Sequence, residues 1–92
     1  NNTLGMVRQW QNVFYEERYS STDMNKKIDY IKVAEGFGAK GFRCETLEEF
    51  EKAFDNALKE KVPVWIECII DKDLKVLPMI PSGGTVEDII LN

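Results

Sequence analysis

The chain has 92 residues, of which 43% are hydrophobic and 30% are charged, proportions typical of one small globular domain. Twelve Lys and Arg residues against sixteen Asp and Glu residues give a net charge of −4. This charge argues against nucleic acid or an anionic membrane surface as a partner. The chain contains no histidine, so it cannot by itself supply an imidazole-dependent catalytic triad or a histidine-ligated zinc site.

The first predicted element is a helix over residues 5–19, where apolar residues recur at helical spacing. These apolar residues are Met6, Trp10, Val13 and Phe14. Arg8 and the Glu16–Glu17 pair fill much of the remainder of the helix. We interpret them as a solvated helix face rather than as acid–base groups, and residues 20–23 form a loop by composition.

A second helix is predicted over residues 28–35, ended by Gly36 and Gly38, and a short strand over residues 41–44 follows it. Thr46 and Glu49 have the spacing of a capping box, which begins a helix over residues 46–61.

Pro63 opens a strand over residues 64–70 that is apolar on both faces, as in parallel sheets covered by helices. We expect Glu67, inside this strand, to face a sheet edge or a partner lysine. Downstream, residues 71–73 and 81–84 read as turns, residues 76–80 as a short extended segment, and Thr85 with Asp88 as the cap of a final short helix.

This order of elements predicts an α/β fold, namely the C-terminal half of a doubly wound parallel-sheet domain that occupies residues 1–92. Two strands are too few to cover the helices, so we expect further strands before Asn1. Cys44 and Cys68 are predicted to be reduced, mostly buried thiols. The longest apolar stretch, residues 62–70, is too short to span a membrane.

The first three residues, Asn1, Asn2 and Thr3, are open to two interpretations. Asparagines in a loop commonly form turns or caps. An amide oxygen at Asn1 and a carbonyl at Thr3 could alternatively serve as oxygen ligands of magnesium, beyond the carboxyl end of a strand.

Two longer stretches carry a resemblance to a known family: residues 1–11, NNTLGMVRQWQ, and residues 76–84, VLPMIPSGG. Shorter matches lie at Phe14–Tyr15, Tyr19–Ser20, Ala34–Glu35 and Gly38–Gly41. Together they make the chain resemble the thiamine diphosphate-binding domain of the acetolactate synthase (acetohydroxyacid synthase) catalytic subunits. The resemblance covers essentially the whole chain.

The resemblance implies a site for Mg²⁺ and the cofactor diphosphate at the start of the chain. Counted back from Leu4 and Gly5, the family spacing makes the Asn1 side chain and the Thr3 carbonyl metal ligands. An alternative register, with a one-residue deletion, makes Asn2 the side-chain ligand. Leu4, Gly5 and Met6 would then contact the cofactor, while the Gly-Asp-Gly that opens the family motif is absent from this chain.

The resemblance further implies that Val7, Trp10, Ser82 and Gly83 line the substrate channel. Without it, Trp10 reads as a core or interface aromatic, Met6 and Val7 as helix packing, and Ser82–Gly83 as a turn. No residue of this chain is expected to be catalytic, because the family's activating glutamate lies on another domain, supplied by the partner subunit.

The implied function is condensation of pyruvate with a second 2-keto acid, pyruvate or 2-ketobutyrate, which begins valine, leucine and isoleucine biosynthesis. The implied cofactors are thiamine diphosphate, Mg²⁺ and FAD, the last held mostly outside this chain. The expected partners are the rest of the catalytic subunit, in a homodimer or homotetramer, with a regulatory small subunit left open. The expected location is the cytoplasm, or a plastid or mitochondrion in a eukaryote.

The 92 residues alone are predicted to be inactive. Two alternatives remain: another thiamine diphosphate enzyme, of the glyoxylate carboligase or pyruvate oxidase type, and a non-catalytic α/β interaction module.

Overall fold

The computed structural model describes residues 1–24 and 28–92, which form two compact units. One unit comprises Asn1 and the described residues 28–71. The other comprises Asn2–Met24 and Lys72–Asn92. We call them the sheet unit and the channel unit, the latter only because it contains the residues predicted to line a channel, and we describe each by itself. No helix among the described residues is long and apolar enough to cross a membrane.

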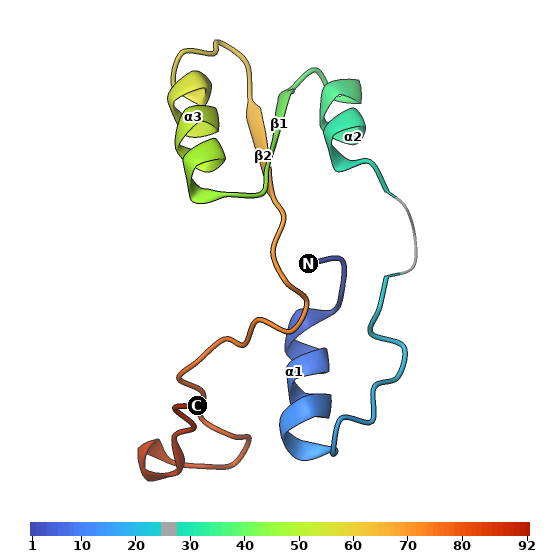
Figure 1. Ribbon diagram of the computed structural model, residues 1–92, viewed down its shortest axis with the longest axis vertical. Helices are drawn as coiled ribbons and strands as arrows, with labels where there is room; N and C mark the ends of the chain where they lie inside the picture. Colours follow the sequence, from blue (N-terminus) through green and yellow to red (C-terminus); the bar gives the residue numbers. More distant parts are fainter. Residues whose placement is uncertain (25–27) are drawn as a thin grey trace. The chain divides into compact units, whose positions relative to one another are not determined.

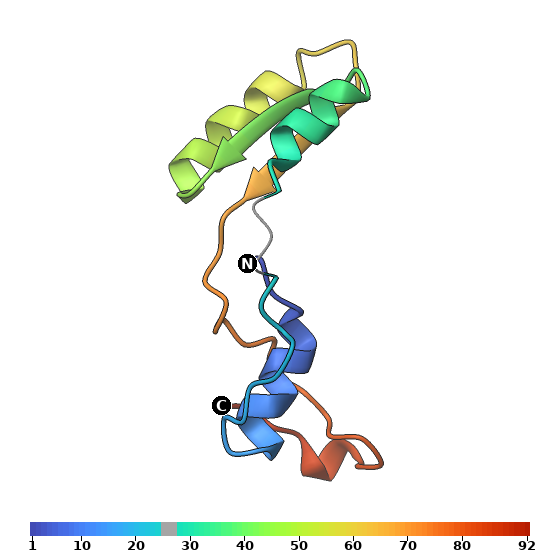
Figure 2. The same cartoon turned by 90° about the vertical axis from the view of Figure 1, so that its right-hand side faces the viewer.

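The sheet unit is built around two parallel strands, β1 (Lys40–Cys44) and β2 (Val64–Cys68). Their register pairs Lys40 with Val64 and Cys44 with Cys68. Helix α3 (Leu47–Ala57) connects the strands, and α2 (Tyr30–Gly36) precedes them. Figure 1 shows α2 and α3 on opposite sides of the strand pair, and Figure 2 shows α3 running alongside β1. The predicted α/β class with parallel strands and helices on both faces is confirmed.

Close packing of small residues fixes the helices against the strands. A Cβ atom on Gly41 of β1 would lie 2.7 Å from Cγ2 of Ile31 on α2, so only glycine permits this approach. The buried apolar residues of the unit are small: Ala34, Cys44 and Ala53. Larger ones remain partly exposed, including Trp65 of β2 at 50%.

Local side-chain bonds define the helix starts in the sheet unit. The Asp29 carboxylate accepts from the Lys32 N–H at 3.1 Å and caps α2, while Thr46 Oγ1 accepts from the Glu49 N–H at 3.2 Å and caps α3. The predicted capping box is confirmed only in its Thr46 half, because the Glu49 carboxylate accepts from the Glu45 N–H instead.

Several helices and strands are shorter than the sequence predicts. Helix α3 ends at Ala57 rather than residue 61, because the Lys59 and Glu60 N–H groups bond three residues back and tighten the last turn. Strand β2 ends at Cys68 rather than residue 70, with one further bond from the Ile69 N–H to the Cys44 carbonyl at 2.9 Å.

Polar groups of the two strands correct two side-chain predictions. Glu67 pairs with Arg43, its register partner, at 2.7 Å, so its partner is an arginine on the neighbouring strand. Cys44 is buried as predicted, but Cys68 is exposed; their Sγ atoms are 3.5 Å apart. Burial raises the pKa of the Cys44 thiol, with a further contribution from Cys68.

In the channel unit, helix α1 (Gly5–Phe14) is shorter than the predicted helix over residues 5–19. Glu16 and Glu17 have φ values of 53° and 59°, and two consecutive left-handed residues cannot continue a right-handed helix. The remainder of the unit is mostly irregular and contains one 3-10 helix, Val86–Asp88, among the described residues. Its predicted cap is confirmed: the Asp88 carboxylate accepts from the Thr85 N–H at 2.8 Å.

Two isolated antiparallel bridges tie the irregular segments of the channel unit. Thr3 pairs with Asp23, and Met79 pairs with Ile90. The segment after residue 72 lies beside α1 within this unit (Figures 1 and 2).

Candidate functional site

The start of α1 carries the residues predicted to contact the cofactor. Leu4 occupies the N-cap position and makes no side-chain cap bond; no acidic residue lies in the first turn. Gly5 and Met6 are the first two helical residues. Without a side-chain cap, the N–H groups of the first turn direct their partial positive charge out of the helix end, which is the arrangement that binds phosphate groups.

Thr3, one of the two predicted metal ligands, sits in the bridge to Asp23. The Met24 N–H bonds the Asn2 carbonyl at 3.0 Å, and the Leu4 N–H bonds the Thr22 carbonyl at 2.8 Å. This pattern makes Thr3 and Asp23 a non-hydrogen-bonded pair, so the Thr3 carbonyl points away from the Asp23 segment.

Asn1 and Asn2, the alternative side-chain ligands, belong to different units, Asn2 with Thr3 in the channel unit. Asn2 has a left-handed φ of 53°, a conformation that asparagine tolerates. Among the described residues, no cluster of three or more His, Cys, Asp or Glu could hold a metal. The predicted ligands would offer an amide oxygen and a backbone carbonyl oxygen, a type that suits Mg²⁺ when phosphate supplies further ligands.

An apolar hollow of about 580 Å³ brings three of the predicted site residues together: Met6, Trp10 and Ser82. The lining is completed by Phe14, Tyr15, Met79, Ile80 and Pro81. One wall is therefore α1 and its end, and the other is the segment 79–82. The lining holds no carboxylate or amine, so the hollow can accommodate apolar and aromatic groups but cannot provide acid–base chemistry beyond its two hydroxyls.

Trp10 also lines a second hollow, which contains Val7, and Gly83 shapes the facing turn. The second hollow, about 480 Å³, is completed by Gln11, Tyr15 and Arg18. Trp10 is 44% exposed and so stands between two open spaces rather than inside a core.

Gly83, with a φ of 77°, is the third residue of the turn that the Gly84 N–H closes onto the Pro81 carbonyl at 2.9 Å. The turn predicted at residues 81–84 is confirmed, and Ser82 is held at its outer corner.

The prediction that Arg8 belongs to a solvated helix face is wrong. Its guanidinium bonds the Asp73 carboxylate at 2.8 Å, lies 3.8 Å from Asp23, and stacks over the Tyr19 ring at 3.8 Å. Only 7% of Arg8 is exposed, because the chain beyond residue 72 folds back over α1. The hydrogen bond and charge of Asp73 raise the pKa of Arg8.

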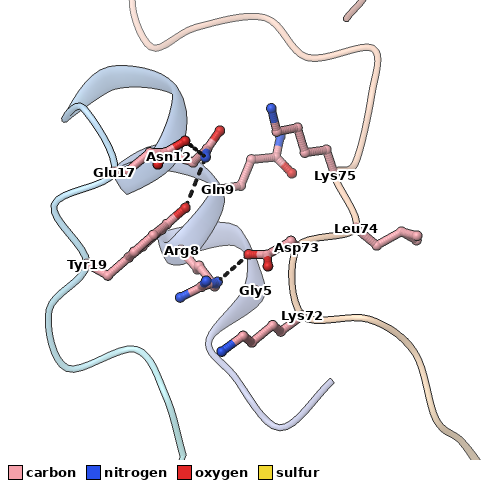
Figure 3. Close-up of a pocket in the computed structure, with 10 residues that line it drawn as sticks. All are labelled: Gly5, Arg8, Gln9, Asn12, Glu17, Tyr19, Lys72, Asp73, Leu74 and Lys75. Atoms are coloured by element: carbon pink, nitrogen blue, oxygen red, sulfur yellow. Dashed lines mark hydrogen bonds and ion pairs between the residues drawn. The ribbon is translucent and has the colours of Figure 1, made fainter.

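Arg8 belongs to a polar hollow of about 410 Å³, drawn in Figure 3. Arg8 points toward Asp73, and Asn12 reaches Glu17 and Tyr19 at 3.3 and 3.0 Å. Lys72 and Lys75 contribute positive charge, which Asp73 and Glu17 oppose. We interpret this hollow as a structural contact between α1 and the segment 72–75, which folds back over it.

Gln9 is a second buried polar residue to which the sequence analysis gave no role. Its side-chain amide donates to the Val76 carbonyl at 3.0 Å and accepts from the Val76 N–H at 2.7 Å. Gln9 precedes Trp10 in the stretch of residues 1–11 that carries the family resemblance. No local pattern indicates that its side chain bonds the backbone of Val76, 67 residues away.

Comparison with known proteins identifies the family. Residues 1–68 match the thiamine pyrophosphate enzyme, C-terminal TPP binding domain. The chain is 41% identical over 95 residues to an acetolactate synthase of Mycobacterium avium, which covers 97% of this chain and 15% of that protein. It is also 41% identical over 90 residues to the mitochondrial acetolactate synthase catalytic subunit of Saccharomyces cerevisiae, covering 98% of this chain and 13% of that protein.

A third relative, the acetolactate synthase isozyme 2 large subunit of Escherichia coli, is 34% identical over 90 residues, covering 98% of this chain and 16% of that protein. The chain thus spans about one seventh of the length of these relatives. The predicted resemblance to acetolactate synthase catalytic subunits is confirmed, and the chain belongs to the thiamine pyrophosphate enzymes, in the family of their C-terminal TPP binding domains.

Proposed function

We propose that this chain forms part of an acetolactate synthase, which condenses pyruvate with a second 2-keto acid, pyruvate or 2-ketobutyrate. This is the first common step of branched-chain amino-acid biosynthesis. The observation that carries the proposal is the apolar hollow, because Met6, Trp10 and Ser82, separated by up to 76 positions, line one space. The relatives at 34–41% identity, all named acetolactate synthases, favour this activity over a glyoxylate carboligase or pyruvate oxidase.

In the proposed enzyme, the start of α1 anchors the cofactor diphosphate through Mg²⁺. The Asn1 amide oxygen and the outward-pointing Thr3 carbonyl would hold the metal, and the uncapped first turn at Leu4, Gly5 and Met6 would face the diphosphate. When bound, thiamine diphosphate supplies the carbon nucleophile that attacks 2-keto acids. The residues of this chain bind and orient; none acts as a general base.

Val7, Trp10, Ser82 and Gly83 then line the approach of the second substrate. An indole beside a methionine, facing a proline-containing turn, makes an apolar passage that favours a larger 2-keto acid. Herbicides that plug such a channel would stack on Trp10.

The remaining parts of the proposal concern the whole protein. FAD would be held mostly outside this chain, the catalytic subunits would associate as dimers or tetramers, and the enzyme would work in the cytoplasm or in an organelle. The 92 residues alone would be inactive, since the activating glutamate and the Gly-Asp-Gly segment would come from elsewhere. Calorimetry of this chain with thiamine diphosphate and Mg²⁺ is expected to give no tight binding.

The main test replaces Trp10 with leucine in the full-length enzyme. We expect the preference for 2-ketobutyrate over pyruvate, on the order of 1–3 kcal/mol for one methylene in a fitted pocket, to collapse, while acetolactate formation stays substantial. The measurement is the ratio of the two products when both acids compete. An unchanged ratio in a folded, active Trp10→Leu enzyme would make Trp10 a packing residue only.

The metal register is tested with Asn1→Ala and Asn2→Ala in the same enzyme. Loss of one oxygen ligand from a site with few ligands should raise the Mg²⁺ and cofactor concentrations needed for half-maximal activity. We expect this for Asn1→Ala, with Asn2→Ala as its matched control. The opposite outcome would place the ligand at Asn2.

A further inference from the structure

The side chain of Gln9 pairs with the Val76 backbone as a neighbouring β-strand residue would. Nε2 donates to the Val76 carbonyl at 3.0 Å, and Oε1 accepts from the Val76 N–H at 2.7 Å. A primary amide is suited to this double bond, because it presents one donor and one acceptor side by side. Gln9 is only 5% exposed, so water cannot readily replace either bond.

The contact leads directly to the wall of the apolar hollow that faces α1. Gln9 Nε2 lies 3.4 Å from Sδ of Met79, three residues after Val76. Met79 is fixed from its other side by Ile90, with paired backbone bonds of 3.0 and 2.7 Å. Met79 and the residues up to Ser82 form that wall.

The next residue after Gln9 is Trp10, which forms the opposite wall. One helical turn of α1 thus carries both the side chain that holds segment 76–79 and the indole that faces it. Arg8 also bonds the returning chain, but at Asp73, which lies three residues before Val76 and outside segment 76–79. The separation between the two walls is therefore set chiefly at Gln9.

We propose that Gln9 is a positioning residue that fixes the width of the apolar hollow and so sets the size of the second 2-keto acid accepted. This inference rests on the proposed function and adds to it a residue outside the channel lining. Loss of the two bonds would let segment 76–79 move away from α1, so the hollow would no longer distinguish acids that differ by one methylene.

The test uses the full-length enzyme with Gln9→Met, which keeps the length of the side chain and removes both bonds. We expect the ratio of 2-ketobutyrate to pyruvate products to fall by roughly fivefold, part of the roughly tenfold or greater discrimination that one methylene provides. Consumption of the first pyruvate should change little, and KM for the second acid should rise more than kcat falls. Gln9→Glu retains the acceptor for the Val76 N–H and should restore part of the ratio.

Hydrogen exchange of the peptide that contains Val76 provides a readout independent of activity. Exchange should accelerate in Gln9→Met, because the Val76 N–H loses its acceptor. The matched control is Asn12→Leu, which removes an amide of the same helix that bonds Glu17 and Tyr19 instead. This control should leave both the product ratio and the exchange of that peptide as in the unmodified enzyme.

Two results would overturn the inference: unchanged exchange, which would deny the contact, or faster exchange with an unchanged product ratio, which would make Gln9 merely structural. If Gln9→Met fails to fold, Gln9→Leu, which also removes both bonds to Val76, decides by the same two measurements. An unmodified enzyme that condenses neither acid would instead overturn the proposed function, and this inference with it.

Discussion

The two units of this chain bury opposite kinds of residue. Among the residues that the structure describes, those buried in the sheet unit are Ala34, Cys44 and Ala53, whereas those buried in the channel unit are Arg8, Gln9 and Thr22. The first unit is held by the backbone pairing of adjacent parallel strands and by the close approach of small groups. The second is held by polar side chains of α1 that bond residues more than sixty positions away, Arg8 to the Asp73 carboxylate and Gln9 to the Val76 backbone. Beside the apolar hollow, regular structure is thus replaced by a few polar side chains whose hydrogen bonds are satisfied.

The largest loss of stability is expected at Gly41 of the sheet unit, where Ile31 of α2 leaves no space for a Cβ atom. Gly41→Ala would place a Cβ atom 2.7 Å from Cγ2 and 3.4 Å from Cβ of Ile31. The Ile31 Cβ moves only with the helix, and Cγ2 moves only by a χ1 rotation that a β-branched residue in a helix resists. Overpacking of this kind costs about 1–3 kcal/mol of the free energy of unfolding. Urea denaturation followed by circular dichroism measures it. Gly36→Ala, where a Cβ would meet nothing within 4 Å, is the control, and equal stabilities for both variants would contradict the close approach.

A smaller and more local effect is expected in the channel unit from Arg8→Met. The variant removes the guanidinium that bonds Asp73 and stacks on Tyr19 but keeps an apolar side chain of similar length. Amide exchange around residues 72–75 should accelerate, while exchange in β1 and β2 stays unchanged. Arg18→Met, which removes an exposed guanidinium bonded to the Tyr15 carbonyl, is the control. Equal acceleration in the strands would show that the units unfold together.

The smallest loss of stability is expected on acidification, which should weaken one helix cap in each unit by a similar amount. Hydrogen bonds from the Lys32 and Thr85 N–H groups lower the pKa of Asp29 and Asp88 respectively. A lowered pKa means that each cap is fully formed above the ordinary aspartate pKa of about 3.9 and is lost as pH falls through the folded value. The chemical shifts of the two amides, followed from about pH 6 to about pH 2, should titrate with midpoints below the ordinary value. Midpoints at or above it would show that the carboxylates do not cap.

The sequence predicted the sheet unit well because its signals are local. Apolar spacing, the Thr46 cap and the residues around Pro63 specified elements that need only neighbours in the chain. Errors in the placement of helices and strands were confined to their ends, where turns such as the one at Lys59 and Glu60 depend on backbone bonds that composition does not reveal.

The channel unit was predicted less completely because its order comes from distant partners. The turn at Pro81–Gly84 and the cap at Thr85 were found, since both are short-range. The burial of Arg8 and Gln9 was missed, because each is satisfied by a residue in the segment 73–76, and helical periodicity places both on a polar face. The early end of α1 was missed because glutamate seldom adopts the left-handed conformation found at Glu16 and Glu17.

The thiols of Cys44 and Cys68, at the last register position of the strand pair, can be used to measure whether the two strands are correctly aligned. Side chains alternate between the faces of a strand, so a slip of β2 by one residue would turn the Cys68 thiol to the opposite face from Cys44. With Sγ atoms 3.5 Å apart, a short reagent that joins two thiols can bridge them only in the correct alignment. The fraction of chains bridged, read by mass spectrometry, would therefore report correct strand pairing in any variant of this protein, without a label being introduced.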